Sequence, residues 1–354
     1  MELRILNREF IDVDVLDTFD SMIWTDRYSQ YGDFEIYTPA NEVTLNLLHK
    51  DFYIWYRDSE HVMIIEEREI STDVEEGNFI TITGRSLESI LLRRIVWKQT
   101  ILSGNLQNGI ERLLNENVIN PEIPERRISN FIFEASTDPA ITALTIEAQF
   151  TGDYIYDAIK KLCDSKQIGF KVILRDGMFV FSLYSGVDRS YSQLVNPHIV
   201  FSPNLDNLFN SNYFESKKAL KTVTLVAGEG EGVDRKTAVI AVSNDGGLDR
   251  RELFTEARDI SSDTNDGTLT PEEYTAQLQQ RGLEKLSENI FITSFEGQAD
   301  TTQLYRYGED FFMGDIVQTR NEYGLESKSR VVEVVHSQNI RDGISIYPTF
   351  KIVE

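Results

Sequence analysis

Hydrophobic and polar residues alternate along the first third of the chain. Ile11, Val13 and Val15 are separated by Asp12 and Asp14, and this period of two predicts a strand with one solvated face. The same alternation recurs at 33–37. Two further segments, 63–70 and 78–83, also predict strands, and Phe79, Ile80 and Ile82 supply β-formers to the second. These two segments flank S-T-D-V-E-E-G, which predicts a hairpin with a loop of several residues. We therefore expect residues 1–98 to form a β-barrel-like module, with a small sandwich as the alternative.

The hydrophobic spacing becomes that of a helix after residue 86. Ser86 is placed to cap a short helix whose apolar face holds Leu87, Ile90 and Leu91. Longer amphipathic helices are predicted at 106–117 and 153–164. Cys163 lies on the apolar stripe of the second of these, which favours a buried small hydrophobe over a nucleophile.

Two β-rich runs follow these helices, at 171–174 and 179–184, with Asp176-Gly177 between them. An Asp-Gly pair in this setting is a strong hairpin signal, because both residues tolerate a positive φ. Residues 99–195 are therefore predicted to form an α+β unit inserted between β-rich parts.

The remaining residues, 196–354, return mostly to strands. Thr270, Pro271 and Glu273 form a capping box with proline at the first helical position, which predicts a helix over 271–288. Two apolar runs, 330–335 and 344–353, flank N-I-R-D-G and predict a closing hairpin. The fold class is therefore mainly β with an α+β insertion and a few short helices. We expect 196–354 to be a second β-rich module that completes discontinuous barrels.

The charge of the chain limits the kinds of partner that it can bind. With 35 basic and 58 acidic residues the formal net charge is −23, which disfavours nucleic-acid binding and anionic membrane surfaces. A single cysteine excludes an intramolecular disulfide and a cysteine metal cluster. The charged start, M-E-L-R-I-L-N-R-E-F, lacks the apolar core of a signal peptide, and no run approaches the roughly 20 apolar residues of a membrane span, so no membrane insertion is expected.

Two stretches imitate ligand-binding motifs. Gly228, Gly230 and Gly232 follow a strand as a dinucleotide loop would, but acidic residues separate them and a strand follows instead of a helix. A turn or bulge is favoured there. Residues 266–273 resemble the second half of an EF-hand loop, but Ser262 and Thr264 stand where the first carboxylate ligands belong. The capping box explains the same residues without calcium.

No other constellation selects a reaction. The histidines lack the i, i+4 pairing of a helical zinc site and lie far apart, at His49, His61, His198 and His336. A G-x-S-x-G elbow is absent. We therefore assign no catalytic, cofactor-binding or metal-binding residue, expect no cofactor, and predict that the protein is not an enzyme.

An acidic segment near the C-terminus, Y-R-Y-G-E-D-F-F-M-G-D-I-V-Q at 305–318, contains Glu309, Asp310 and Asp315. We interpret it as the corner of a barrel. The Phe and Met residues would be buried, Gly314-Asp315 would form a tight turn, and the acids would be solvated. A metal cluster is the alternative interpretation.

Several stretches together resemble the tail-hub proteins of phages and prophages, the structural N-terminal part of tail-associated lysins and relatives of contractile baseplate hubs. The similar segments are I-W-T-D-R-Y-S-Q-Y-G-D-F-E-I-Y-T-P (23–39), I-I-E-E-R-E-I and I-T-I-T-G-R-S-L-E-S-I-L-L-R-R-I-V (64–96), K-L-C-D-S-K-Q-I-G-F-K-V-I-L-R-D-G-M-F-V-F (161–181), V-A-G-E-G-E-G-V-D-R (226–235) and Y-G-E-D-F-F-M-G-D-I-V. They span nearly the whole chain, and their combination carries the resemblance.

The resemblance implies a non-enzymatic homotrimer whose two β-barrel-like modules per chain form a pseudo-sixfold ring. Such a ring joins the distal tail protein to the tail tip, meets the tape measure protein, and passes the genome through an acidic lumen. A fibre or lysin would be on a separate chain, because no such region follows in this sequence. The expected location is the virion tail tip or baseplate, after assembly in the bacterial host cytoplasm. The residues leave two alternatives open: a tail-tip enzyme that cleaves cell-wall glycan or peptide, and a receptor-binding tip protein.

Overall fold

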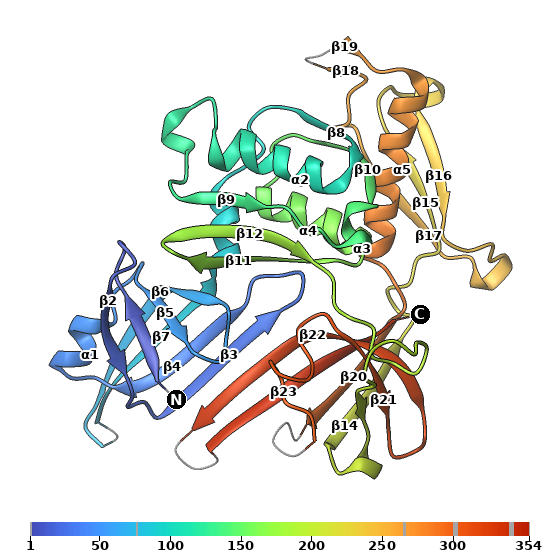
Figure 1. Cartoon of the computed structure of the whole chain (residues 1–354). Helices are drawn as coiled ribbons and strands as arrows, with labels where there is room; N and C mark the ends of the chain where they lie inside the picture. Colours follow the sequence, from blue (N-terminus) through green and yellow to red (C-terminus); the bar gives the residue numbers. More distant parts are fainter. Residues whose placement is uncertain (1, 76, 265–266, 300–303, 340–342, 354) are drawn as a thin grey trace.

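The computed structural model describes residues 2–75, 77–264, 267–299, 304–339 and 343–353. A large sheet of thirteen strands forms one side of the molecule, and helices with smaller sheets lie on the other side (Figure 1). The predicted fold class, mainly β with an α+β insertion, is confirmed.

The first part of the sheet comes from the N-terminal module. Its elements are β1 (Leu3–Leu6), β2 (Asp12–Leu16), β3 (Ser21–Arg27), β4 (Asp33–Pro39), α1 (Glu42–Leu47), β5 (Tyr53–Tyr56), β6 (Val62–Asp73) and β7 (Gly77–Ser86). Alternate residues of these strands, among them Met22, Trp24 and Ile36, fill a core on one face, as the period of two requires.

The second part of the sheet comes from the C-terminal module. Its elements are β13 (Val200–Phe201), a 3₁₀ turn (Pro203–Leu205), β14 (Leu208–Ser216), β20 (Ile292–Ala299), β21 (Ile316–Arg320), β22 (Glu326–Asn339) and β23 (Gly343–Ile352). The hairpin between β22 and β23 forms, but residues 340–342 of its predicted turn lie outside the described ranges. The modules are joined where β22 pairs with β3, so the strand order is β14-β20-β23-β22-β3-β4-β7-β6-β5-β1-β2.

The two modules repeat one topology. The order β3-β4-β7-β6-β5 in the first corresponds to β14-β20-β23-β22-β21 in the second. The register shifts between Ile65 and Glu67 in β6, and between Val331 and Glu333 in β22. Each strand then leads through a turn to the strand that it pairs with, β7 and β23. The registers make Glu67 equivalent to Glu333. Each of these carboxylates accepts a hydrogen bond from a threonine on the next strand, at 3.3 and 3.2 Å.

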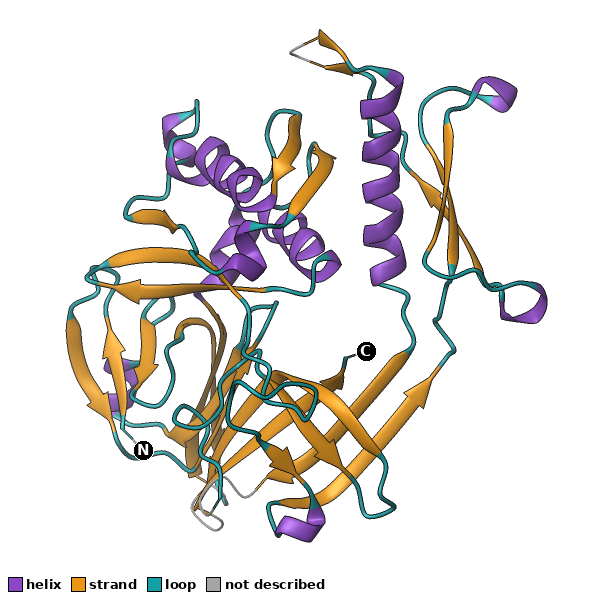
Figure 2. Ribbon diagram, turned by 45° about the vertical axis from the view of Figure 1, so that its right-hand side comes forward, coloured by secondary structure: helices purple, strands orange, loops and turns teal. Residues whose placement is uncertain are grey.

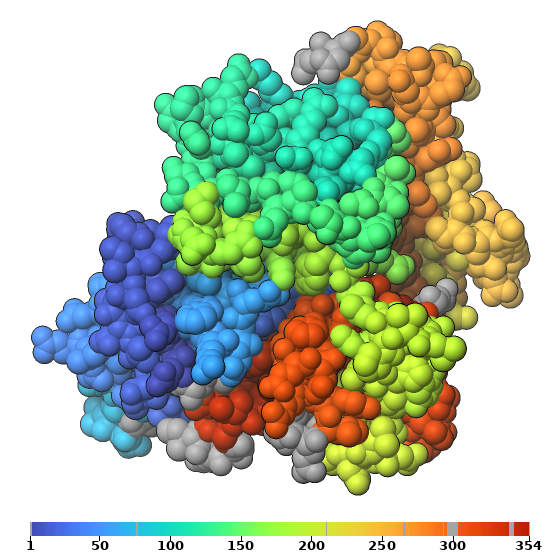
Figure 3. All heavy atoms as spheres, in the orientation of Figure 1, coloured from blue at the N-terminus to red at the C-terminus, as the bar shows by residue number. Residues whose placement is uncertain are grey.

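An α+β unit lies across both modules (Figure 3). Its elements are a 3₁₀ helix (Leu87–Arg93), β8 (Thr100–Asn105), α2 (Leu106–Leu114), a π turn (Asn115–Ile119), a 3₁₀ turn (Pro124–Arg126), β9 (Phe131–Glu134), α3 (Pro139–Thr142), β10 (Thr145–Phe150), α4 (Ile155–Ser165), β11 (Gly169–Arg175) and β12 (Met178–Tyr184). Cys163 is buried, and Asp176-Gly177 forms the predicted hairpin with φ of 53° and 72°. Ser86 is at the N-cap of the short helix, as predicted, but its hydroxyl makes no capping bond and instead bonds Glu88 and the Gly32 amide.

A further unit is inserted between β14 and β20. It contains β15 (Val223–Ala227), a 3₁₀ turn (Gly232–Asp234), β16 (Thr237–Ala241), a 3₁₀ turn (Gly247–Asp249), β17 (Glu252–Glu256), β18 (Asp263–Thr264), β19 (Gly267–Thr268) and α5 (Pro271–Ser287). The Thr270–Glu273 capping box is present. Helix α5 packs between the β15–β17 sheet and the α+β unit, where it contacts α4 and β10 (Figure 2). Residues 196–354 thus supply both the C-terminal module and this separate unit.

Candidate functional site at the junction of the modules

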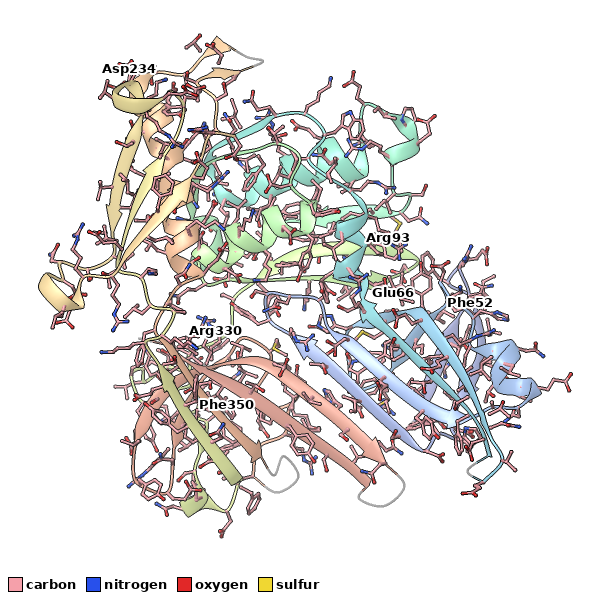
Figure 4. The ribbon with its side chains drawn as sticks, turned by 180° about the vertical axis from the view of Figure 1, so that it is seen from behind. Phe52, Glu66, Arg93, Asp234, Arg330 and Phe350 are labelled. Atoms are coloured by element: carbon pink, nitrogen blue, oxygen red, sulfur yellow. The ribbon has the colours of Figure 1, made fainter. Side chains whose placement is uncertain are left out.

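The junction is the place where both modules meet the α+β unit, and it contains Tyr28, Tyr184, Gly314, Asp315 and Arg330 (Figure 4 labels Arg330). The rings of Tyr28 and Tyr184 meet edge to face, 5.2 Å apart, and the Tyr184 hydroxyl donates to the Tyr28 carbonyl at 3.1 Å. Arg330 donates to the Tyr28 hydroxyl and to the Gly314 carbonyl, at 3.2 and 3.0 Å. Burial raises the pKa of both tyrosines, so both remain neutral.

Glycines permit this close packing. A Cβ atom on Gly314, whose φ is +89°, would lie 2.4 Å from the Tyr28 ring. A Cβ atom on Gly186 would lie 1.8 Å from the Gly314 carbonyl oxygen, and one on Gly169 would lie 2.6 Å from Tyr28. A side chain at any of these glycines would collide with a segment other than its own. The three glycines therefore fix the relative position of the two modules and the α+β unit.

Asp315 links the end of the α+β unit to the C-terminal module. Its carboxylate accepts hydrogen bonds from the Val187 amide and from Arg189 Nε, both at 2.7 Å, and from the Phe312 amide at 3.1 Å. The expectation of a solvated acid is wrong here, since Asp315 is only 2% exposed. The positive φ of Gly314 turns the chain so that this side chain points at residues 187–189.

The other residues of the acidic segment agree better with the barrel corner that the sequence predicts. Glu309 and Asp310 are exposed, and Phe311 and Met313 are buried in the core of the C-terminal module. Phe312 is 46% exposed, contrary to the expectation that all Phe residues here are buried. Glu309 and Asp310 face solvent, whereas the Asp315 carboxylate binds residues 187–189, so the segment does not bring its three acids together.

A second buried acid, Glu88, was missed at the sequence level. It accepts a hydrogen bond from the Val172 amide of β11 at 2.8 Å and lies 3.2 Å from His61 Nδ1. Burial alone lowers the pKa of His61, but the charges of Asp26 and Glu88 outweigh it and raise the pKa to about 9. The sequence contained one signal of this burial, because Glu88 is a single carboxylate within the apolar run L-E-S-I-L-L. The pair fixes the N-terminal module to the α+β unit.

Asp26 and His336 lie on the two strands that join the modules. Asp26 accepts hydrogen bonds from Trp24 Nε1 and Ser59 Oγ, both at 3.0 Å, and its carboxylate is 3.8 Å from His336 Nε2. Burial lowers the pKa of His336, so it is neutral at pH 7. Sequence reasoning did not place His61 and His336 in one buried polar region, because the two residues are distant along the chain.

The two motif-like stretches have structural roles. Glu229 of the glycine-rich loop accepts hydrogen bonds from the Ser262 amide and the Ser261 hydroxyl, at 2.7 and 2.9 Å. Burial would raise the pKa of Glu229, but bonds from Ser262, Ser261 and Lys236 lower it to about 2. The EF-hand-like stretch includes the β18–β19 hairpin, with Asp266 outside the described residues. Within the described ranges, no three His, Cys, Asp or Glu side chains are placed to hold a metal ion.

The face of the large sheet that points away from the core is polar and acidic. One row of paired residues crosses six strands, from β6 to β23: Glu67, Thr83, Glu35, Ile23, Ser337 and Ser345. Arg27 and Arg85 on this face are both held in ion pairs, with Asp33 and Glu333 and with Glu66. None of the helices in the described ranges is both long and apolar enough to cross a bilayer.

Comparison with known proteins places this fold among tail proteins. The model of the siphovirus ReqiPepy6 Gp37-like protein family matches residues 2–350. No sequence among the curated proteins matches the chain. Three solved structures share the fold at low sequence identity, so their likeness concerns the fold alone.

The 43 kDa tail protein of prophage MuSo2 from Shewanella oneidensis superposes with a TM-score of 0.61 at 12% identity, covering 100% of this chain and 98% of that one. Prophage tail protein gp18 from Listeria monocytogenes EGD-e gives 0.57 at 13% identity, with 99% and 94% covered. A tail protein from Neisseria meningitidis MC58 gives 0.56 at 12% identity, with 99% and 96% covered. The resemblance to phage tail proteins is therefore confirmed.

Proposed function

We propose that this chain, which belongs to the siphovirus ReqiPepy6 Gp37-like family and has the fold of prophage tail proteins, is the tail hub of a bacteriophage or prophage. In this role it forms a homotrimeric ring at the tail tip or baseplate of the virion. The ring joins the distal tail protein to the tip and meets the tape measure protein. Lytic or receptor-binding activity is assigned to a separate chain, and no reaction is assigned to this one.

The observation that carries the proposal is the repeated topology of the two modules. Three chains with two similar modules each would present six similar units around an axis while keeping threefold symmetry. Such a ring can contact a hexameric ring on one side and threefold structures on the other. The junction supports this role, because buried polar contacts and glycines hold the modules at one relative angle.

The acidic outer face of the sheet supports passage of the genome. Glu35, Glu67 and Glu69 lie on this face, while its arginines are neutralised in pairs. A lumen of this charge would repel the phosphate backbone and let DNA slide without adhering. We propose that this face lines the channel. A surface potential over the assembled lumen that is neutral or basic would remove this part of the proposal.

The mass of the purified protein in solution tests the hub proposal. Light scattering over a range of concentrations, with and without the distal tail protein, is expected to give three times the chain mass in at least one condition. A monomer in every condition contradicts the proposal. In that case, turnover of host cell walls and binding to host cells would test the enzyme and receptor-binding alternatives.

A further inference from the structure

Two pairs of consecutive arginines that are far apart in the sequence lie together on the α+β unit. Arg93 ends the first 3₁₀ helix of this unit, and Arg94 follows it (Figure 4 labels Arg93). Arg126 ends the later 3₁₀ turn, and Arg127 follows it. Arg94 Nε donates a hydrogen bond to the Arg126 carbonyl oxygen, and Arg126 Nη2 donates to the Ile95 carbonyl oxygen, both at 2.6 Å. These two bonds hold the two segments side by side.

The four arginines carry positive charge that is not neutralised by ion pairs. Within the described ranges none of them pairs with a carboxylate, not even with the exposed Glu125 beside them, whereas most of the other arginines are paired. Arg94 and Arg126 donate to backbone carbonyls and to the Asn117 carboxamide instead. Burial and the neighbouring charge of Arg94 lower the pKa of Arg126. A chain of net charge −23 thus has one patch where positive charge gathers.

An exposed tryptophan lies beside these arginines. The Trp97 side chain is 55% exposed, and the Arg126 guanidinium lies over its ring, 5.0 Å from the ring centroid. Asn117, a buried residue of the π turn, holds both of them. Its Oδ1 accepts hydrogen bonds from the Trp97 amide at 3.1 Å and from Arg126 Nη2 at 3.2 Å. The indole is therefore exposed in a fixed position.

The composition and the rigidity of this patch favour a protein partner. Arginine and tryptophan contribute much of the binding energy at protein interfaces, and arginines bind carboxylates through paired hydrogen bonds. A patch that is already held in one conformation loses less entropy when it binds. A long polyphosphate chain would also meet the repulsion of the remaining acidic surface, which disfavours nucleic acid as the ligand.

We propose that the arginine–tryptophan patch binds an acidic segment of a partner protein; the patch consists of Arg93, Arg94, Trp97, Arg126 and Arg127. Carboxylates of the segment would pair with the arginines, and an apolar side chain between them would cover the Trp97 ring. Exclusion of water by the bound segment would strengthen the ion pairs. The patch is complete within one chain, so the inference goes beyond the hub proposal and does not depend on ring formation.

Fluorescence anisotropy tests the proposal. The probe is a fluorescein-labelled octapeptide, E-E-L-E-E-L-E-E, titrated with the full-length protein at physiological salt. R93E/R127E reverses the two exposed arginines, and we expect it to weaken binding by about tenfold or more. K217E/K218E is the matched control, because it makes the same change of charge at another exposed pair of basic residues. It should weaken binding by about twofold or less, since salt screens distant charges.

A second variant, W97A, tests the apolar contact. It should weaken binding of the octapeptide by about threefold or more and have less effect on an octapeptide of glutamate alone. The tryptophan emission of the wild type should change on binding, and W97A should lose this change, because Trp24 is fully buried and Trp55 is partly buried. Melting temperatures close to that of the wild type would show that each variant remains folded.

The outcomes are distinct from those of the hub proposal. Binding that is lost in R93E/R127E and retained in K217E/K218E supports the patch. The proposal is overturned if the wild type does not bind the octapeptide, if both double variants lose binding equally, or if a single-stranded oligonucleotide of the same charge binds more tightly. Light scattering tests the hub separately, because a monomer can bind the octapeptide and a trimer can fail to bind it.

Discussion

Ile70 and His336 occupy equivalent positions in the two modules, yet Ile70 is 49% exposed and His336 is 1% exposed. The difference has one structural source: β3 pairs with β22, whereas no strand of the described chain pairs with residues 66–72 of β6 on the side away from β7. A position that the fold buries in one repeat and leaves open in the other indicates an assembly surface. The relationship leads to a prediction about the proposed ring.

Replacing Ile70 by Asp should prevent ring formation without unfolding the chain. The side chain is half exposed in the monomer, so the melting temperature of the monomer should change little. In the proposed ring the carboxylate would be buried where two copies meet, and we expect trimer formation to weaken by tenfold or more, about 1.4 kcal/mol. Analytical ultracentrifugation measures this. V74D is the control, because Val74 is fully exposed on the adjoining turn and outside residues 66–72. Equal effects of both variants would argue against a specific contact at Ile70.

Asp315→Ala should strongly destabilise the fold. The substitution removes three hydrogen bonds and leaves the guanidinium of Arg189, which is 16% exposed, without its ion-pair partner. Loss of one partner of a buried pair costs roughly 3 kcal/mol or more. Urea unfolding should show this as a lower midpoint, whereas D310A, on the exposed acid of the same segment, should change stability by about 0.5 kcal/mol or less. Similar midpoints for both variants would contradict the role given to Asp315.

Gly314→Ala should cost more than the same change at Gly308. Both glycines have a positive φ, +89° and +85°, so both substitutions carry a strain of about 1 kcal/mol. Only at Gly314 does the added methyl group meet the Tyr28 ring; at Gly308 nothing lies within 4 Å. The difference in unfolding free energy between the two variants therefore measures the packing of the junction. No difference would show that the junction relaxes freely.

The His61–Glu88 pair predicts a loss of stability at alkaline pH. The pKa of His61 is raised from 6.5 to about 9 in the folded protein, so the protonated form stabilises the fold fully below pH 6.5. This contribution disappears as the pH rises from 6.5 through 9. Burial lowers the pKa of His336, so the folded protein binds no proton there over this range and His336 cannot cause a loss of stability as the pH rises. Unfolding free energies measured across this interval should fall in the wild type and fall less in H61Q. If the unfolding free energies of the wild type and H61Q fell in parallel, a group other than His61 would cause the loss of stability at alkaline pH.

Reversing charge on the acidic face should create DNA binding. E35K/T81K adds positive charge to the face proposed to line the lumen, where the charges of three copies would converge on one channel. E231K/V233K adds the same charge to the exposed loop of the inserted unit, near Asp234 in Figure 4. Fluorescence anisotropy with a short duplex should give binding about tenfold tighter for the first variant, steeply weakened by salt. Equal binding by both variants would contradict a shared channel.

The sequence predicted local structure better than long-range placement. Two β-rich runs around a turn predicted β6 and β7, and the capping box predicted α5, because these signals depend on neighbouring residues. Two similar β modules were expected from the family resemblance alone, and the pattern of residues showed no internal repeat. Between β6 and β22 the equivalent positions share only Glu67 with Glu333 and Ser71 with Ser337, so alignment by eye finds no period.

The candidate site was also hidden by distance along the chain. Asp315 was interpreted as solvated because its neighbours Glu309 and Asp310 are, whereas its actual partners come from residues 187–189. Glu88 had no predicted role, and its burial follows from β11, which brings the Val172 amide against it. In both cases a carboxylate is buried only because a segment from another part of the chain supplies donors.

Electron microscopy of the assembled protein, viewed along its axis, would show directly whether it forms the hub ring. We expect a threefold ring around an open channel, with six similar β modules and β6 of each copy beside β14 of the next. A dimer, a ring without a channel, or a threefold ring whose copies meet through the β15–β17 unit with β6 and β14 left free would contradict this expectation.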